Sequence, residues 1–264
     1  MLEIKDLYKV FNGGTVNEKI ALQGVSLHLE PGDFVTVIGG NGAGKSTMLN
    51  CVAGAYPVES GKILIDGVDV THLPEFKRAK YIGRVFQDPM MGTAATMQID
   101  ENLALAARRG KFRGLSTGIS KAERESYREQ LKMLDLGLES RLTAKVGLLS
   151  GGQRQALTLL MATLQKPKLL LLDEHTAALD PKTAAKVLDV TKRIVEQNQL
   201  TTLMITHNMR DAIAYGNRLI MMYDGKIVID VSGEEKKNLT VEQLLNLFSK
   251  ASGSDEANDK LLLS

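Results

Sequence analysis

Apolar and polar residues alternate along the first thirty positions, with the two-residue period of strands that bury one face in a sheet. Residues 2–7 and 21–30 follow this period, and each stretch predicts a strand. The run FVTVI at 34–38 is nearly all apolar and rich in β-branched residues, which is typical of a strand buried on both faces. A glycine-rich loop and a short helix that ends at Gly54 are expected to follow it.

Turn signals divide the apolar runs further along the chain. Asp66 and Asp224 are each followed by glycine and lie between two apolar runs, which predicts a tight hairpin at each place. Apolar runs at 168–174 and 201–207 predict two more buried strands. Pro181 is expected to open a helix between them that runs to about 197.

The stretch from about 89 to 165 shows no strand signal and predicts a helical insertion within an α/β body. Ser120 and Glu123 form a capping box ahead of a polar helix in this stretch. A second capping box, at Thr240, begins a last amphipathic helix. Residues 249–264 are expected to form a flexible tail.

Composition excludes several classes of protein. The chain has 264 residues, of which 44% are hydrophobic and 24% charged, so it is neither disordered nor fibrous. The 33 Lys and Arg nearly balance the 31 Asp and Glu, so the net charge of +2 provides no global attraction to nucleic acid or anionic lipid. No window approaches the roughly 18 consecutive apolar residues that cross a membrane. The single cysteine, Cys51, excludes an internal disulfide and is expected to be a small buried hydrophobe.

The clearest chemical signal is a phosphate-binding loop. The sequence GGNGAGKS at 39–46 matches the pattern G-x-x-x-x-G-K-[ST] and lies between an expected buried strand and a helix, as that pattern requires. Glycines let backbone N–H groups approach phosphate oxygens, and the helix N-terminus adds partial positive charge. The residues expected to bind the phosphates of a nucleotide here are Gly39, Asn41, Gly42, Ala43, Gly44, Lys45, Ser46 and Thr47.

Hydrolysis also needs a second carboxylate for the metal and a group that activates water. Lys45 is expected to reach the β- and γ-phosphates, and Ser46 to bind Mg²⁺. Asp173 and Glu174 follow a buried run, at the end of a strand where ligands of open α/β sheets bind. With the phosphate loop upstream, we interpret Asp173 as a further Mg²⁺ ligand and Glu174 as the general base. An ordinary acidic strand exit is the alternative.

Further motifs, in a fixed order, distinguish among the classes of phosphate-loop protein. LSGGQ at 149–153 lies about twenty residues before the acidic pair and resembles the signature of ATP-binding cassette (ABC) ATPases. Gln87 resembles the Q-loop glutamine of that family, Asp180 the D-loop aspartate and His207 the switch histidine. The resemblance covers about residues 1–248.

This resemblance implies a fold. The class would be α/β, a P-loop NTPase of the ABC type, with an antiparallel β subdomain and an inserted α-helical subdomain. The single domain would span residues 1–248, with a RecA-like core and the β subdomain in 1–88 and 166–248. Residues from about 89 to 165 would form the helical signalling subdomain.

The resemblance also implies a head-to-tail dimer that holds each ATP between the phosphate loop of one subunit and the signature of the other. Gln87 would join the Mg²⁺ shell, and His207 would contact the γ-phosphate and orient the attacking water. Phe11 would stack on adenine, with Tyr8 as the alternative. The residues implied to contact ATP across the dimer are Ser150, Gly151, Gly152, Gln153 and Asp180.

One position departs from the family pattern. His175 follows Glu174 where the family usually has proline, and this leaves the stiffness of the loop open. The whole run DEHTAALD at 173–180 resembles an importer-like subgroup.

The resemblance implies partners as well. The chain has the ATPase motifs but no span, so we expect it to serve integral membrane permease subunits at the cytoplasmic face of the cell membrane. The permease would dock near residues 87–97 and the helical subdomain. Met90, Met91 and Met97 offer an adaptable surface there, or alternatively fill the helical core. An extracytoplasmic solute-binding protein is a further expected partner, and nucleic acid is not expected. The basic run 108–113 is interpreted as a solvated loop, with contact to lipid headgroups or nucleic acid as the alternative.

The sequence therefore predicts the ATP-hydrolysing subunit of a membrane transporter, with import of a small organic solute such as an amino acid. The alternatives are an exporter ATPase and a soluble ABC ATPase that acts on nucleic acid or ribosomes. Glu174 and His207 disfavour a non-hydrolytic ATP-gated module, because such a module does not need them.

Overall fold

Two β-sheets form the frame of the computed structural model, which describes residues 1–111 and 118–252. The smaller sheet is antiparallel, with the strand order β2-β1-β4-β5. Its strands are β1 (Leu2–Phe11), β2 (Lys19–Leu29), β4 (Ser60–Ile65) and β5 (Val68–Asp69). Buried and exposed positions roughly alternate along β1 and β2, because one face of this sheet covers the core and the other meets solvent.

The larger sheet has the strand order β10-β9-β3-β8-β7-β6 and is parallel except for β10. Its strands are β3 (Phe34–Ile38), β6 (Ile82–Val85), β7 (Leu169–Asp173), β8 (Thr201–Ile205), β9 (Arg218–Tyr223) and β10 (Lys226–Ser232). Every residue of β3 is buried, as its nearly all-apolar pattern predicts for a strand covered on both faces.

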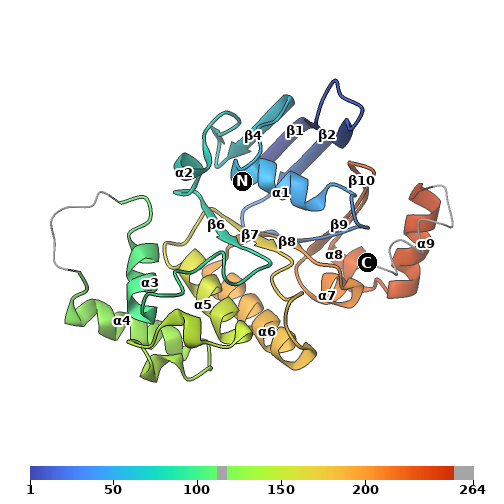
Figure 1. Cartoon of the computed structure of the whole chain (residues 1–264). Coiled ribbons are helices and arrows are strands. Elements are labelled where there is room, and N and C mark those ends of the chain that lie inside the picture. The colour runs from blue at the N-terminus through green and yellow to red at the C-terminus, as the bar shows by residue number, and fades with distance from the viewer. Residues whose placement is uncertain (112–117, 253–264) are drawn as a thin grey trace.

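Helices cover both faces of the larger sheet. Figure 1 shows α1 between the two sheets, α5 and α6 across the opposite face, and α3 and α4 beyond them, away from α9. The helices are α1 (Lys45–Ala53), α2 (Glu75–Arg78), α3 (Ile99–Ala107), α4 (Lys121–Lys132), α5 (Gly151–Thr163), α6 (Pro181–Asn198), α7 (Met209–Ala214), α8 (Gly233–Lys237) and α9 (Val241–Ser252), with short 3₁₀ turns at Leu138–Ser140 and Val146–Leu148.

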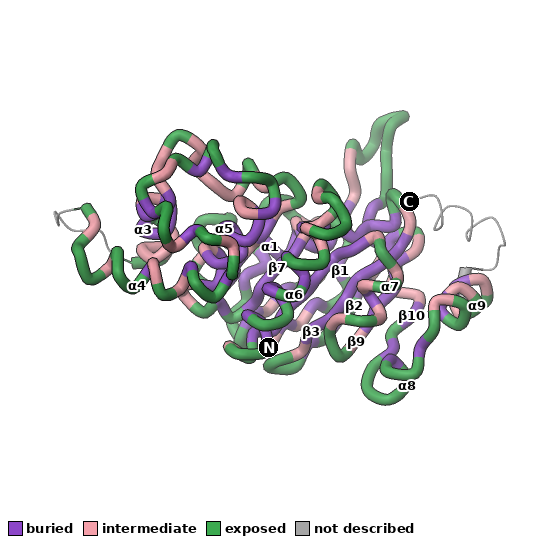
Figure 2. The backbone as a smooth tube through the Cα atoms, turned by 90° about the horizontal axis from the view of Figure 1, so that it is seen from below, coloured by how far each residue is buried: buried purple, intermediate pink, exposed green. Residues whose placement is uncertain are grey.

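Buried side chains form separate clusters on the two faces of the larger sheet. One cluster fills the space between the sheets around α1, and a second lies between β7, β8 and the helices α3 to α6. A third joins α7 and α9 to β9 and β10. The buried backbone accordingly runs through the centre of Figure 2, with exposed segments at its periphery. The larger sheet is therefore covered on both faces, and the loops at its strand ends extend from a packed core.

Both predicted hairpins are confirmed. Ile65 pairs with Val68, and Tyr223 pairs with Lys226, so each turn has two residues. Asp66 has a φ of 54° and the following glycine 78°, and Asp224 has 45° with 71° after it. Positive φ at both central residues is the requirement of the type I′ turn, which explains the Asp-Gly pairs.

The strand that the pattern fails to predict is β6. It has four residues, and a glycine and an arginine interrupt its apolar run. The glycine has a packing reason, because a Cβ at Gly83 would lie 2.5 Å from the carbonyl oxygen of Ala162 on α5. The described residues between β6 and β7 contain helices and no strand, as predicted. The last helix continues to Ser252, which places 249–252 in a helix and not in the predicted flexible tail, while the rest of that tail, like Phe112 and Arg113 of the basic run, lies outside the described residues.

Candidate functional site

The glycine-rich loop connects β3 to α1 and accepts only glycine at two positions. Gly39 has a φ of 149°, and a Cβ there would lie 2.2 Å from the carbonyl oxygen of Met222. Gly44 has a φ of 101°, and its Cβ would lie 2.6 Å from the carbonyl oxygen of Ala21. The backbone therefore folds tightly at both ends of the loop, and the N-terminus of α1 faces the space that the loop encloses.

Lys45 is buried at the first position of α1, with 5% of its surface exposed. Its Nζ donates to the carbonyl oxygens of Gly39 at 2.6 Å and Gly40 at 3.2 Å. Burial lowers the pKa of Lys45, while the nearby carboxylates of Glu174 and Asp173 act to raise it. The loop thus holds a positive charge next to two acidic groups.

A cavity of about 180 Å³ opens over this loop. The residues that line it are Phe11, Lys19, Ala21, Asn41, Gly42, Ala43, Gly44, Lys45, Ser46, Thr47 and Glu174. The structure therefore brings the predicted adenine-stacking residue, nearly all of the predicted phosphate loop and the predicted base to one place. Gly39 does not line the cavity, and its carbonyl oxygen accepts a hydrogen bond from Lys45.

The two aromatic candidates for adenine stacking lie in different places. Phe11 lines the cavity and packs edge-on against Tyr56, with ring centroids 5.4 Å apart. Tyr8 lies against Gly24, where a Cβ would meet its hydroxyl at 3.0 Å. Of the two, only Phe11 is on the wall of the cavity.

Lys19 is a site residue that sequence reasoning misses. It begins β2, and its Nζ lies 3.6 Å from the position that a Cβ of Gly42 would take. A lysine at the start of an exposed strand gives no pattern that distinguishes it from a solvated charge. Its approach to the phosphate loop results from the packing of β2 beside α1.

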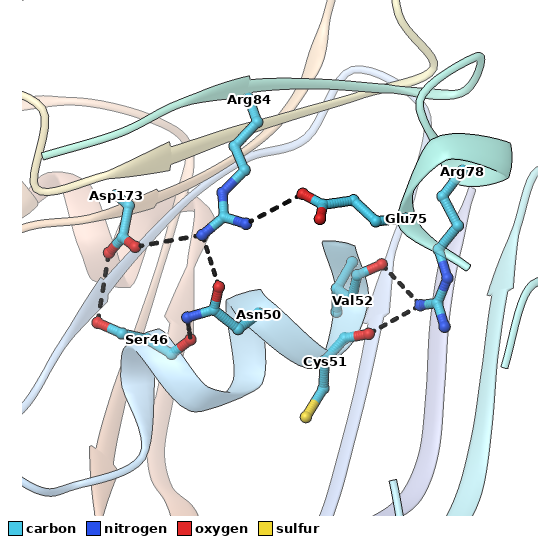
Figure 3. Close-up of polar contacts among 8 residues, drawn as sticks. All are labelled: Ser46, Asn50, Cys51, Val52, Glu75, Arg78, Arg84 and Asp173. Carbon is cyan, nitrogen blue, oxygen red and sulfur yellow. Dashed lines mark hydrogen bonds and ion pairs between the residues drawn. The ribbon is translucent and has the colours of Figure 1, made fainter. Parts of the chain in front are cut away.

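The predicted metal ligands meet at the start of α1 and the end of β7. Ser46 Oγ lies 3.3 Å from Asp173 Oδ1 (Figure 3). Both side chains offer oxygen ligands, which Mg²⁺ prefers, so the residues present fit this cation. The described residues contain no group of three or more His, Cys, Asp or Glu side chains that could hold a metal. In nucleotide sites Mg²⁺ usually completes its shell with phosphate oxygens and water.

A network that the sequence did not predict surrounds Asp173 (Figure 3). Asn50 donates to the Ser46 carbonyl at 2.8 Å and accepts from Arg84 at 2.6 Å. The same guanidinium lies 3.8 Å from Asp173 Oδ2. Burial raises the pKa of Asp173, the positive charge of Arg84 lowers it, and the neighbouring Glu174 raises it again. Burial and the neighbouring carboxylate thus act against the positive charge of Arg84 at this carboxyl.

Glu174 and His207 contact each other directly. Glu174 Oε1 lies 2.6 Å from Nε2 of His207, and only 9% of Glu174 is exposed. An ionised carboxylate can only accept, so the imidazole donates from Nε2. Glu174 has a φ of 46°, unusual for a residue with a side chain, and its N–H donates to the carbonyl oxygen of Ile205 at 3.1 Å. The turn after β7 thus aims this carboxylate at the end of β8.

His175 explains how that turn is held. Its imidazole is buried beneath the loop, and Nε2 lies 3.0 Å from the hydroxyl of Thr191 on α6. That hydroxyl donates to the carbonyl oxygen of Val187 at 2.8 Å, so it accepts from the histidine. Burial lowers the pKa of His175 to about 4, so the ring is neutral at neutral pH. A buried hydrogen bond to α6 anchors the turn where the family usually has proline.

His175 predicts a loss of stability in acid. The unfolded chain binds this proton below about pH 6.5, whereas the folded chain excludes it until about pH 4, so falling pH favours unfolding. We expect this group to remove about 3 kcal/mol of unfolding free energy between pH 7 and pH 4. Urea unfolding at several pH values measures the slope.

The matched variants are His175→Gln, which should flatten that slope, and His72→Gln, which replaces an exposed histidine and should leave it unchanged. An equal slope in wild type and His175→Gln contradicts the assignment.

The signature residues lie at the N-terminus of α5, away from the phosphate loop. Ser150 Oγ accepts from the Gln153 N–H at 3.3 Å, and Gln153 Oε1 accepts from the Ser150 N–H at 3.2 Å, which forms a capping box. Gly152 is confined, because a Cβ there would lie 2.0 Å from a methyl of Thr183. Ser150, Gly152 and Gln153 line a second cavity of about 380 Å³ between α5 and α6. Within one chain, the signature and the phosphate loop therefore line different cavities.

Asp180 caps α6 beside this second cavity. Its Oδ1 accepts from the Thr183 N–H at 3.1 Å, and hydrogen bonds from Thr183 lower its pKa. Gly151, at the first position of α5, has the Leu179 side chain beside it, 3.3 Å from the place of a Cβ. Asp180 and the signature residues therefore lie next to each other, at the N-termini of α6 and α5.

Gln87 lies in a third place, a groove of about 760 Å³. The residues that line the groove are Asn50, Ala55, Tyr56, Glu75, Arg84, Phe86, Gln87, Asp88, Met91, Asp173 and Ala178. Gln87 and Asp173 both line this groove. Met90 and Met91 are exposed at 48% and 68%, so they do not fill the helical core.

The fold and the cavity over the loop define a class of protein, the P-loop nucleotide-binding proteins with an inserted helical region and a signature loop on the far edge. Within that class, residues 22–177 match the family described as ABC transporter, and the chain belongs to this family.

Known proteins similar to the chain agree with this assignment. A tyrosine transport ATP-binding protein of Clostridioides difficile is 45% identical over 95% of this chain and 100% of its own length. A phosphonates import ATP-binding protein of Lactococcus lactis is 32% identical over 95% of this chain and 99% of its own. A dimeric ATP-binding cassette, solved in a post-hydrolysis state with ADP and Pi, superposes with a TM-score of 0.75 at 31% identity, covering 88% of this chain and 98% of its own.

The activity of the protein follows from its family. The chain binds ATP and hydrolyses it, and the hydrolysis powers a transporter. The predicted fold class is confirmed, and so is the predicted resemblance. Among residues 1–111 and 118–252, no helix is both long and apolar enough to cross a lipid bilayer.

Proposed function

We propose that the chain is the ATPase subunit of an importer for a small organic solute such as an amino acid. The observation that supports the ATPase site most directly is the cavity that gathers Phe11, the phosphate loop and Glu174. The relatives named for tyrosine transport and phosphonate import support the direction and the kind of solute.

In this proposal each group of the ATP site has one task. Phe11 stacks on adenine, and Thr47 and the N–H groups of the loop from Gly39 to Gly44 bind phosphate oxygens. Lys45 exchanges its two carbonyl partners for the β- and γ-phosphates. Glu174 takes a proton from the attacking water, and His207 donates to the γ-phosphate from the nitrogen that now contacts Glu174.

Ser46, Asp173 and Gln87 are the proposed Mg²⁺ ligands. When bound, Mg²⁺ supplies positive charge that neutralises phosphate oxygens. The oxygen donors of Ser46 and Asp173 are already 3.3 Å apart, so little movement is needed to hold the ion.

We infer a head-to-tail dimer because the signature and the phosphate loop occupy separate cavities in one chain. A second copy can present the N-terminus of α5, with its partial positive charge, to the γ-phosphate. The residues that would act across the dimer are Ser150, Gly151, Gly152, Gln153 and Asp180. The dimeric cassette that superposes on this chain supports the arrangement.

The groove beside Gln87 is the proposed permease contact. It reaches the stretch 87–97, and its exposed Met91 provides an adaptable apolar surface. The proposed domain organisation follows: 1–88 and 166–248 form the catalytic body, and about 89–165 the helical signalling subdomain. The chain would then bind peripherally at the cytoplasmic face of the cell membrane. An extracytoplasmic solute-binding protein would belong to the same system, and no nucleic acid would.

Copurification tests this proposal. The tagged full chain, recovered from native membranes in mild detergent, should bring down a multi-span membrane protein. Met91→Glu should reduce the recovered permease by about tenfold, because a charge in the apolar contact must be desolvated. Met133→Glu, at an exposed methionine after α4, is the control and should leave recovery unchanged. Recovery of ribosomes or DNA in place of a membrane protein contradicts the transporter proposal.

A further inference from the structure

Arg84 connects the metal site to the groove beside Gln87. The guanidinium donates to Asn50 Oδ1 at 2.6 Å from the same nitrogen that lies 3.8 Å from Asp173 Oδ2. Its other terminal nitrogen lies 3.8 Å from Glu75 Oε1 (Figure 3). One cation therefore stands between Glu75 and Asp173, the proposed metal ligand, and both carboxylates line the groove.

The Arg84 guanidinium interacts more strongly with Asp173 than with Glu75, because water is more fully excluded around Asp173. The side chains of Arg84 and Asp173 are 13% and 15% exposed, whereas that of Glu75 is 57% exposed. Charges interact more strongly where water is excluded. The ring of Phe86, with its centroid 4.4 Å away, covers one face of the guanidinium and helps to hold it there.

The same cavity exposes both ends of this contact. Arg84, Glu75 and Asp173 line the groove together with Gln87 and Met91. Anything that occupies the groove therefore meets the cation that faces Asp173. A group that draws Arg84 toward Glu75 would leave Asp173 without its positive neighbour.

We propose that Arg84 is a positioning residue that competes with the metal ion for Asp173 and so couples the occupancy of the groove to metal binding. The inference rests on the proposed assignment of Asp173 to the metal. Arg84 and a divalent cation cannot both lie against this carboxylate without mutual repulsion. In the isolated chain Arg84 therefore weakens metal binding, and displacement of Arg84 strengthens it.

Direct metal binding tests the proposal without measuring hydrolysis. Free Mn²⁺ is followed by electron paramagnetic resonance as it is titrated into the full chain with a non-hydrolysable ATP analogue. Arg84→Met should lower the Mn²⁺ dissociation constant about tenfold, because it removes the competing charge. Arg84→Lys keeps the charge without the planar fork, and its constant should stay close to that of wild type. A purely structural role would make these two variants alike.

Glu75→Gln should change the Mn²⁺ dissociation constant in the opposite direction. Glu75 is exposed, so this substitution should not disturb folding. It removes the second carboxylate beside Arg84, so the guanidinium stays with Asp173 and Asn50, and the Mn²⁺ dissociation constant should rise about twofold. Arg109→Met is the matched control, since that half-buried guanidinium donates to the Ala162 carbonyl and has no carboxylate partner among the described residues. It should leave the constant unchanged.

Asp173→Asn separates failure of this proposal from failure of the metal assignment. If Asp173→Asn does not weaken Mn²⁺ binding, the metal assignment is wrong. If Asp173→Asn weakens binding while Arg84→Met leaves it unchanged or weakens it too, the metal assignment stands and the competition by Arg84 is wrong. A lower Mn²⁺ dissociation constant in Glu75→Gln than in wild type would also contradict the proposed coupling.

Discussion

Glu174→Gln should bind ATP as wild type does and hydrolyse it roughly 100-fold to 10,000-fold more slowly, the usual contribution of a general base. The amide keeps an oxygen that accepts from His207, so the 2.6 Å contact and the turn after β7 should survive. It cannot take a proton from water. ATP would then stay bound, and an ATP-bound dimer should accumulate on size-exclusion chromatography in the presence of Mg²⁺.

The control for this experiment is Glu196→Gln, which removes an exposed carboxylate on α6 and should leave turnover unchanged. Phosphate release at saturating ATP measures the rate. A Glu174→Gln rate within twofold of wild type would mean that another group activates the water.

Lys45→Ala should lose ATP binding, with a dissociation constant at least about 50-fold above that of wild type. The substitution removes the positive charge that faces the β- and γ-phosphates. Two hydrogen bonds to a charged group, at about 1.5–3 kcal/mol each, together exceed the roughly 2.3 kcal/mol that a 50-fold change represents. Titration of a fluorescent ATP analogue measures the constant. Lys62→Ala, at an exposed lysine on β4, is the control.

A folding defect has to be distinguished from a binding defect here. Lys45 also donates to the carbonyl oxygens of Gly39 and Gly40, so its loss should cost about 1–3 kcal/mol of unfolding free energy as well. Thermal unfolding gives the folded fraction at the binding temperature. Unchanged affinity in a folded Lys45→Ala protein would place the phosphates elsewhere.

Several elements could be predicted because their signals are local. The type I′ hairpins at Asp66 and Asp224 depend on two adjacent residues with positive φ. The loop at 39–46 depends on glycines that its own backbone path requires. The buried strands at 34–38 and 168–174 depend on short apolar runs. In each case a few neighbours along the chain determine the geometry, so a short stretch of sequence is sufficient.

Other features depended on packing between distant segments. Strand β6 is short and interrupted by Gly83 and Arg84, and becomes a strand because β7 lies beside it and α5 packs closely on it. Lys19 gives no local signal. Phe11 lines the cavity and Tyr8 does not, because the pairing of β1 within its sheet determines which way each side chain faces.

By itself, the sequence determined the phosphate loop, the acidic pair at Asp173 and Glu174, the order of the ABC motifs and hence the family. Only the tertiary structure decided what surrounds those groups: Arg84 beside Asp173, His175 anchored to α6, and the signature in a cavity separate from the phosphate loop. The reason is physical. Backbone conformation depends on adjacent residues, whereas the electrostatic partner of a side chain depends on sheet order, which brings together strand ends far apart in the chain.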